Sequence, residues 1–134
     1  MNAFFNKQYK LESSEKFDEY MKAMGVGLVT RKMGNAVSPV VELKQDGDEY
    51  TLTSNSTFKN VTTKFKLGEQ MDDETPDGRK VKSTFTISGS TLHEDQVGAD
   101  GKTTTIDRIF SGDEIKMVCK VDDITCTRIY KLQA

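Results

Sequence analysis

A chain of 134 residues without a low-complexity segment fits a single domain, which most often spans roughly 100 to 150 residues. The net charge is −2, and the 19 basic residues are spread among 21 acidic ones, which excludes the concentrated positive surface of a nucleic-acid-binding protein. No stretch approaches the roughly 20 apolar residues of a membrane span, and the first residues lack the apolar core of a signal peptide. We therefore predict one cytoplasmic domain over residues 1–134.

The predicted elements begin with a short strand and a helical hairpin. Residues 7–11 are predicted to form a strand. In residues 13–25, apolar side chains recur at helical spacing behind a serine cap and ahead of a glycine stop. A second short helix is predicted over residues 28–34, because one side of it carries Leu28, Val29, Lys32 and Met33.

From residue 38 onward, turn residues recur about every ten positions, as in a series of hairpins. Between the turns lie short runs rich in Val, Ile, Thr, Phe and Tyr, and these predict about nine further strands. Two short helices cannot cover so many strands, so the sheet must close into an antiparallel barrel or fold into a two-sheet sandwich. A barrel of more than about eight strands is wide enough to hold a ligand.

Hairpin parity places two arginines on the inside of this sheet. In residues 114–121 apolar side chains alternate with lysines, which identifies the inward face. If a two-residue turn follows, Met117 pairs with Arg128, and Tyr130 faces the same way. The preceding turn places Arg108 opposite Met117 from the other side. The two arginine backbones are then two strand spacings apart, or roughly 10 Å.

Two buried guanidinium groups need an anionic partner, because burying one unpaired ion costs several kcal/mol of folding free energy. The inward faces of these three predicted strands carry no Asp or Glu. A ligand carboxylate is the simplest partner, since guanidinium and phenol groups can fill its lone pairs. The alternative is an internal network with ordered water, completed by an acidic residue from elsewhere such as Glu69, Asp73 or Glu74.

Short motifs over essentially the whole chain resemble one known family. They are residues 17–22 (FDEYMK), 25–27 (GVG), 30–32 (TRK), 56–60 (STFKN), 65–68 (FKLG), 77–83 (DGRKVKS) and 126–130 (CTRIY). Each motif is weak alone, but the ordered set is similar to the intracellular lipid-binding proteins, and within them to the fatty-acid-binding proteins of heart/muscle and epidermal type.

The resemblance implies a ten-stranded antiparallel up-and-down β-barrel, or clam, of the calycin type, capped by a helix-turn-helix around a water-filled interior. It implies a fatty-acid carboxylate held by Arg108, Arg128 and Tyr130, with one guanidinium in direct contact and the other acting through water. Retinol-binding members typically carry Gln at the two arginine positions, so an acidic ligand is favoured. The other candidate ligand-binding residues, around the portal, the acyl chain and the arginines, are Phe17, Tyr20, Met21, Phe58, Asp77 and Met117.

We therefore predict a monomeric carrier that binds a long-chain fatty acid non-covalently for transport. The alternatives are a carrier of retinoic acid or another hydrophobic acid, and a ligand-dependent regulatory partner of another protein. We predict no enzyme, metal or cofactor, because the chain has one histidine and no catalytic motif. Lys22, Arg31 and Lys32 on the helical hairpin either form a solvated face or meet anionic membrane surfaces.

Two further features concern single positions. Cys119 and Cys126 are predicted to lie opposite each other, at a separation compatible with a disulfide. Epidermal-type relatives carry a similar pair, but in a reducing cytosol two thiols lining the cavity are the expectation. Asn6 stands where relatives usually have glycine and Tyr9 where they have tryptophan, and we expect only local adjustment there.

Overall fold

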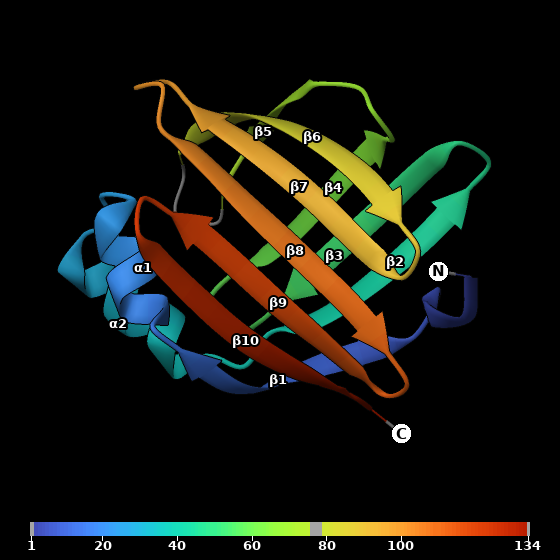
Figure 1. Cartoon of the computed structure of the whole chain (residues 1–134). Helices are drawn as coiled ribbons and strands as arrows, with labels where there is room; N and C mark the ends of the chain where they lie inside the picture. The colour runs from blue at the N-terminus through green and yellow to red at the C-terminus, as the bar shows by residue number, and fades with distance from the viewer. Residues whose placement is uncertain (1, 76–78, 134) are drawn as a thin grey trace.

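Two helices and ten strands make up the computed structural model, which describes residues 2–75 and 79–133. A 3-10 turn at Asn2–Phe4 precedes them (Figure 1). The elements are β1 (Gln8–Glu15), α1 (Phe17–Ala23), α2 (Leu28–Ala36), β2 (Val40–Asp46), β3 (Glu49–Asn55), β4 (Asn60–Lys66), β5 (Met71–Glu74), β6 (Lys80–Ser88), β7 (Thr91–Gly98), β8 (Thr103–Ser111), β9 (Glu114–Val121) and β10 (Ile124–Leu132).

All the strands belong to one antiparallel sheet in the order β4-β3-β2-β1-β10-β9-β8-β7-β6-β5. Every neighbour follows in chain order except β1 and β10, which join the two ends of the chain. In the described residues no ladder joins β4 to β5, so the barrel is nearly closed. The predicted ten-stranded up-and-down barrel is therefore confirmed.

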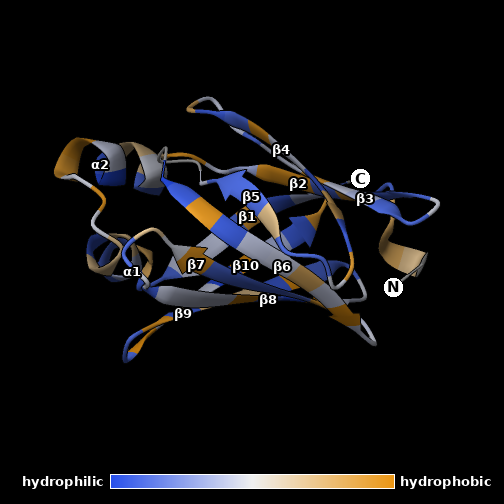
Figure 2. Cartoon of the chain, turned by 90° about the horizontal axis from the view of Figure 1, so that it is seen from above, coloured by the Kyte–Doolittle hydropathy of each residue, from blue (hydrophilic) through white to orange (hydrophobic). Residues whose placement is uncertain are grey.

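The helices form a cap at one end of the barrel, and α1 lies against β9 and β10 (Figures 1 and 2). Tyr20 and Met21 of α1 are buried. The predicted serine cap is wrong: the serines belong to β1, where Ser14 pairs with Arg128 of β10. Lys16 takes the N-cap position with φ 60°. Sheet pairing along β10 thus extends the strand at the expense of the helix.

The second helix begins at its predicted residue, Leu28, and ends at Ala36, two residues beyond the predicted range. Leu28, Val29 and Met33 are 57%, 73% and 45% exposed. No residue of α2 is buried, and Figure 2 shows apolar colour on this helix at the edge of the molecule. Helical spacing predicted which residues share a face, and that face points to solvent.

Aromatic and aliphatic side chains fill the end of the barrel away from the helices. The rings of Phe65 and Phe85 stack with centroids 3.9 Å apart, and Leu92 and Ile115 pack in the same cluster. A second cluster beneath α1 contains Tyr20 and the two cysteines. The period-two alternation predicted for the strands therefore produces a main core at one end and a smaller cluster beneath α1.

The two unusual positions of the first strand behave differently. Asn6 has φ 62°, in the left-handed region where glycine is favoured and asparagine is tolerated. Tyr9 is fully buried, and its ring meets that of Phe110 edge-on at 5.9 Å. Its hydroxyl has no hydrogen-bond partner within residues 2–75 and 79–133.

We expect Tyr9→Phe to raise the free energy of unfolding by about 1 kcal/mol, because a buried hydroxyl without a partner costs roughly that much. The ring and its contact with Phe110 are retained in the variant. Urea unfolding of the delipidated protein measures the change. A loss of stability would show that the hydroxyl has a partner, such as an ordered water molecule.

Candidate ligand-binding cavity

The register of the last three strands places both arginines as predicted. A two-residue turn joins β9 to β10, so that Arg128 pairs with Met117 and Tyr130 with Ile115. On the other side, Arg108 of β8 also pairs with Met117. Arg128 is 6% exposed, and the side chain of Arg108 is 12% exposed. Hairpin parity thus predicted the inward direction of both side chains correctly.

These side chains face an internal cavity between the helical cap and the aromatic end of the barrel. Asp77 lies outside the described residues. The other eight candidate residues all line the cavity: Phe17, Tyr20, Met21, Phe58, Arg108, Met117, Arg128 and Tyr130. The structure brings these residues together, and their contact with a ligand remains a prediction.

Arg128 is a buried cation without an ion-pair partner among the described residues. Its guanidinium lies 3.8 Å from the centroid of the Phe17 ring, which gives a cation–π contact but no hydrogen bond. Its Nε is buried without a partner, and in the described part of the chain no ion pair reaches it. This side chain therefore retains donors for a group that enters the cavity.

Tyr130 offers a hydroxyl beside this cation. Its oxygen lies 3.8 Å from the sulfur of Met117, and its ring lies 5.9 Å from the Arg128 guanidinium. Burial raises the pKa of Tyr130, so the phenol keeps its proton at neutral pH. It can donate one hydrogen bond to an anion next to Arg128.

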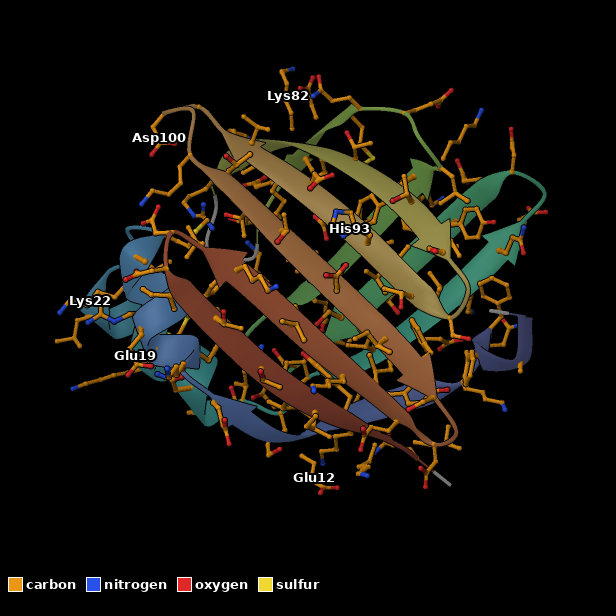
Figure 3. The ribbon with its side chains drawn as sticks, viewed as in Figure 1. Glu12, Glu19, Lys22, Lys82, His93 and Asp100 are labelled. Carbon is orange, nitrogen blue, oxygen red and sulfur yellow. The ribbon has the colours of Figure 1, made fainter. Side chains whose placement is uncertain are left out.

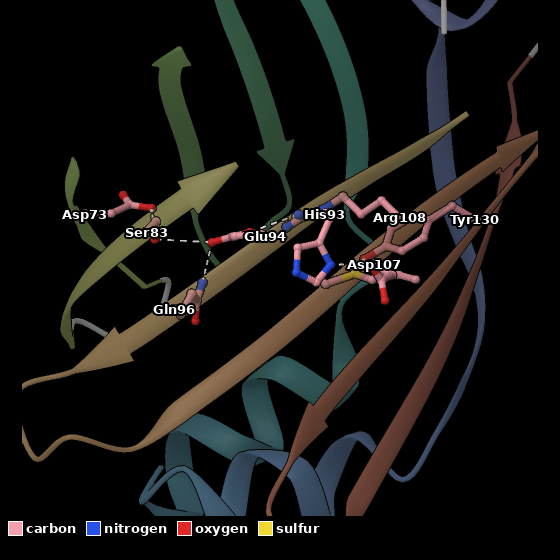
Figure 4. A network of polar contacts seen from close by, with 9 residues as sticks. Asp73, Ser83, His93, Glu94, Gln96, Asp107, Arg108 and Tyr130 are labelled. Atoms are coloured by element: carbon pink, nitrogen blue, oxygen red, sulfur yellow. Dashed lines mark hydrogen bonds and ion pairs between the residues drawn. The ribbon is translucent and has the colours of Figure 1, made fainter. Parts of the chain in front are cut away.

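Arg108 has a partner within the protein. Its Nη1 donates to Oε1 of Glu94 at 2.9 Å, and the carboxylate side chain is only 3% exposed. Oε2 of Glu94 accepts a hydrogen bond from Gln96 at 2.6 Å and one from Ser83 at 3.3 Å (Figure 4). For Arg108, the structure therefore agrees with the alternative prediction of an internal network completed by an acidic residue. A ligand carboxylate is not needed to balance the charge of Arg108.

The network includes only part of what the sequence predicted. Asp73 contacts it through Ser83 at 3.5 Å, and burial raises the pKa of Asp73, with a further contribution from Glu94. Glu69 and Glu74 are exposed. The central acid, Glu94, was missed although it alternates with Leu92, which pairs directly with Arg108. Alternation groups Glu94 with Leu92, but the connection from β7 to β8 is too long for a two-residue turn to fix their register against Arg108.

The two cysteines lie opposite each other as predicted. Both are free and buried. A hydrogen bond with Cys126 and burial both raise the pKa of the Cys119 thiol, which makes it a poor nucleophile at neutral pH. Cys119 lines the cavity beside Met117, where it acts as a small apolar side chain.

The basic residues of the cap do not all present free charges. Lys22 and Lys32 are exposed, and Figure 3 shows Lys22 pointing away from the barrel. Arg31 instead bonds to Asp18 at 3.2 Å and to the carbonyl of Val26 at 2.7 Å. No helix in the described residues is long and apolar enough to cross a membrane. Nor do these residues contain a group of three or more His, Cys, Asp and Glu side chains that could hold a metal ion.

His93 precedes Glu94 in β7 and so lies on the opposite face of the strand (Figure 4). Its Nδ1 is 2.5 Å from Asp107, and its Nε2 is 3.1 Å from Asp95. The hydrogen bond with Asp107 is the main reason why the pKa of His93 is raised. The protonated imidazole therefore stabilises the folded state below the ordinary histidine pKa, and this contribution disappears as the pH rises through the raised value.

We expect His93→Gln to lower the free energy of unfolding by up to about 1 kcal/mol at about pH 5.5, and by much less at about pH 9, because the pair is partly exposed. Urea unfolding at both pH values measures this difference. Asp107→Asn is the matched control and should lose the same pH-dependent part. Equal destabilisation of His93→Gln at both pH values would contradict the prediction.

A nearly closed antiparallel barrel with a helical cap and an internal cavity is the architecture of a protein class that encloses small ligands. Residues 7–133 match the family described as "Lipocalin / cytosolic fatty-acid binding protein family". The chain belongs to this family.

Individual relatives agree with this assignment. The muscle fatty acid-binding protein of Schistocerca gregaria is 49% identical over 132 residues, which is 97% of each chain. The sodium/calcium exchanger regulatory protein 1 of Doryteuthis pealeii is 46% identical over 121 residues, or 90% of each chain. A solved structure of the Schistosoma mansoni fatty acid binding protein with arachidonic acid is 41% identical and has a TM-score of 0.95, covering 100% of this chain and 98% of that one.

Proposed function

We propose that this protein is a cytoplasmic carrier that holds one long-chain fatty acid non-covalently inside the barrel. The observation that carries the proposal is Arg128, a buried guanidinium with no anionic partner among the described residues, facing a cavity lined mainly by apolar side chains. The family assignment and the relatives named for fatty-acid binding support the ligand class. The family's description as cytosolic supports the compartment.

In this proposal Arg128 and Tyr130 bind the carboxylate directly. Arg108, on the other side of Met117, interacts with the carboxylate through water. Apolar burial supplies most of the affinity, at roughly 25 cal/mol per Å² of chain surface removed from water. Phe17, Tyr20, Met21 and Phe58 are the candidates for contact with the acyl chain. The arginines determine which end of the ligand lies beside them, because only the carboxylate can form charge-assisted hydrogen bonds with a guanidinium group.

Competitive titration of the delipidated protein tests the ligand class. Oleate, arachidonate, retinoic acid and retinol each displace a bound fluorescent fatty acid. We expect the two fatty acids to bind most tightly and retinol most weakly, since retinol cannot neutralise Arg128. Tighter binding of retinoic acid would favour the alternative acid carrier, and equal binding of retinol would contradict a carboxylate site.

We also propose that the carrier acts as a monomer and without catalysis, since family members are lipid-binding carriers. Light scattering of the purified protein should give the mass of one chain. Turnover of a lipid ester above a buffer blank would contradict the absence of catalysis.

The exposed part of the cap supports contact with membranes during ligand transfer. Lys22 and Lys32 supply positive charge, each worth about 1 kcal/mol near an anionic surface. The apolar residues Leu28 and Val29 beside them are exposed. Fatty-acid transfer to vesicles should accelerate with anionic lipid content and slow with salt. Transfer rates that depend neither on anionic lipid content nor on salt concentration would contradict this role.

A second candidate function is ligand-dependent regulation of another protein. The relative named as a sodium/calcium exchanger regulatory protein favours it, as does the exposed apolar side of α2. Pull-downs with delipidated and fatty-acid-loaded protein separate the two functions. Capture of a partner only by the loaded form would support regulation, and identical capture by both forms would contradict it.

A further inference from the structure

The two interior arginines flank the same methionine but differ in charge balance. Arg108 forms an ion pair with Glu94 at 2.9 Å, and both side chains are almost fully buried. Arg128 has no hydrogen bond or ion pair within residues 2–75 and 79–133, and contacts the ring of Phe17. One of the two buried positive charges is thus already neutralised by the chain itself.

Glu94 is fixed in this position. One of its oxygens accepts from Arg108, and the other accepts from Gln96 at 2.6 Å and from Ser83 at 3.3 Å. A carboxylate with both oxygens occupied in a buried network has no equally good alternative position. The pair is therefore part of the cavity wall and not a side chain that moves away when a ligand enters.

The other charged residues facing the cavity do not change this balance. Asp73 lines the cavity, is half-buried and contacts Ser83, so it adds negative potential on the same side as Glu94. Lys59 and Glu74 are exposed and Arg79 is half-buried, so water and salt screen their charges more strongly. Arg128 is left as the buried cation available to an incoming anion.

We propose that Glu94 is a specificity-determining residue that restricts the cavity to lipids with one negative charge and excludes head groups with two, such as alkyl phosphates. This inference rests on the proposed carrier function. A fatty acid brings one charge, which Arg128 balances. A phosphate monoester has a second pKa near about 6 and carries almost two charges at about pH 8. The second charge would need Arg108, which Glu94 already occupies, and would remain buried without compensation.

Titrations at about pH 8 with myristate and tetradecyl phosphate, which have the same chain length, test this proposal. The unaltered protein should bind myristate more tightly. Glu94→Gln frees Arg108, so the affinity for the phosphate should rise by about tenfold or more and that for myristate by a smaller factor, because the added attraction scales with ligand charge.

Two further variants keep the test decisive if Glu94→Gln folds poorly. The double variant Glu94→Gln/Arg108→Gln again leaves one interior cation, so the preference for myristate should return. Arg108→Gln alone leaves Glu94 unpaired and should weaken the phosphate more than myristate. Asp72→Asn is the matched control, since this exposed carboxylate of β5 pairs with Lys82 on the outside and its loss should leave the ratio of affinities within about twofold.

The outcomes separate the two proposals. If the unaltered protein does not bind myristate, the carrier function fails and the inference fails with it. If myristate binds but the unaltered protein takes the phosphate equally well, only the inference is overturned. The same holds if the ratio of affinities is unchanged in Glu94→Gln, or changes equally in Asp72→Asn.

Discussion

Replacing Arg128 with glutamine is expected to weaken fatty-acid binding by roughly 10- to 100-fold, because charge-assisted hydrogen bonds contribute about 1.5 to 3 kcal/mol. The same change should leave the delipidated protein equally stable or more stable. Arg128 is buried, and no residue in the described part of the chain is its anionic partner, so a neutral amide of similar length removes an uncompensated charge. Opposite effects on affinity and on stability would identify a residue kept for binding and not for folding.

Fluorescent displacement measures the affinity, and urea unfolding of the delipidated protein measures the stability. Lys116→Gln is the matched control, because this lysine lies on the exposed face of β9 next to Met117. It should change neither quantity appreciably. Unchanged affinity in Arg128→Gln would refute the assignment of the carboxylate site, whatever its effect on stability.

Phe85→Ala is expected to lower the free energy of unfolding by about 3 to 5 kcal/mol, the usual loss for a buried phenylalanine. Phe85 is 1% exposed, and its ring stacks on that of Phe65 with centroids 3.9 Å apart. Both rings belong to the cluster that fills the barrel away from the helices. Since the other core cluster is smaller and the interior also contains a cavity, this cluster provides much of the packing that holds the sheet closed.

Phe58→Ala is the control for this prediction. Phe58 lines the cavity and is half-buried, but it is outside both core clusters. We expect a loss of less than about 1 kcal/mol in urea unfolding together with weaker fatty-acid binding. Equal losses of stability in the two variants would contradict the separation between a packed end and a binding end.

Hairpin parity succeeded where the turn fixed the register. Two-residue turns join β8 to β9 and β9 to β10, and Gly112 and Asp122 adopt the positive φ values, 55° and 53°, that such turns require. The inward direction of both arginines could therefore be predicted. The connection from β7 to β8 is longer, running over residues 99–102, so the sequence alone did not fix which residue would lie opposite Arg108.

Local signals failed where tertiary contacts decided the structure. The serines before α1 are good helix caps, yet pairing with β10 extends β1 through them. Helical spacing grouped the apolar residues of α2 but could not determine whether that side meets the barrel or solvent. The ion pair of Arg108 with Glu94 depends on a side chain of β7. This strand lies outside β8, β9 and β10, the three strands whose register the two-residue turns fix.

The pairing of β1 with β10 has a consequence for how the protein folds. These strands contain the two ends of the chain, and residues as far apart as Tyr9 and Leu132 are partners. During synthesis the ladder between β1 and β10 cannot form until β10 has left the ribosome. Until then, the edge of β1 that pairs with β10 has no partner strand. Closing contacts of such long sequence separation carries a high entropic cost and slows folding. Formation of the β1–β10 ladder thus determines when the barrel wall around the cavity is completed.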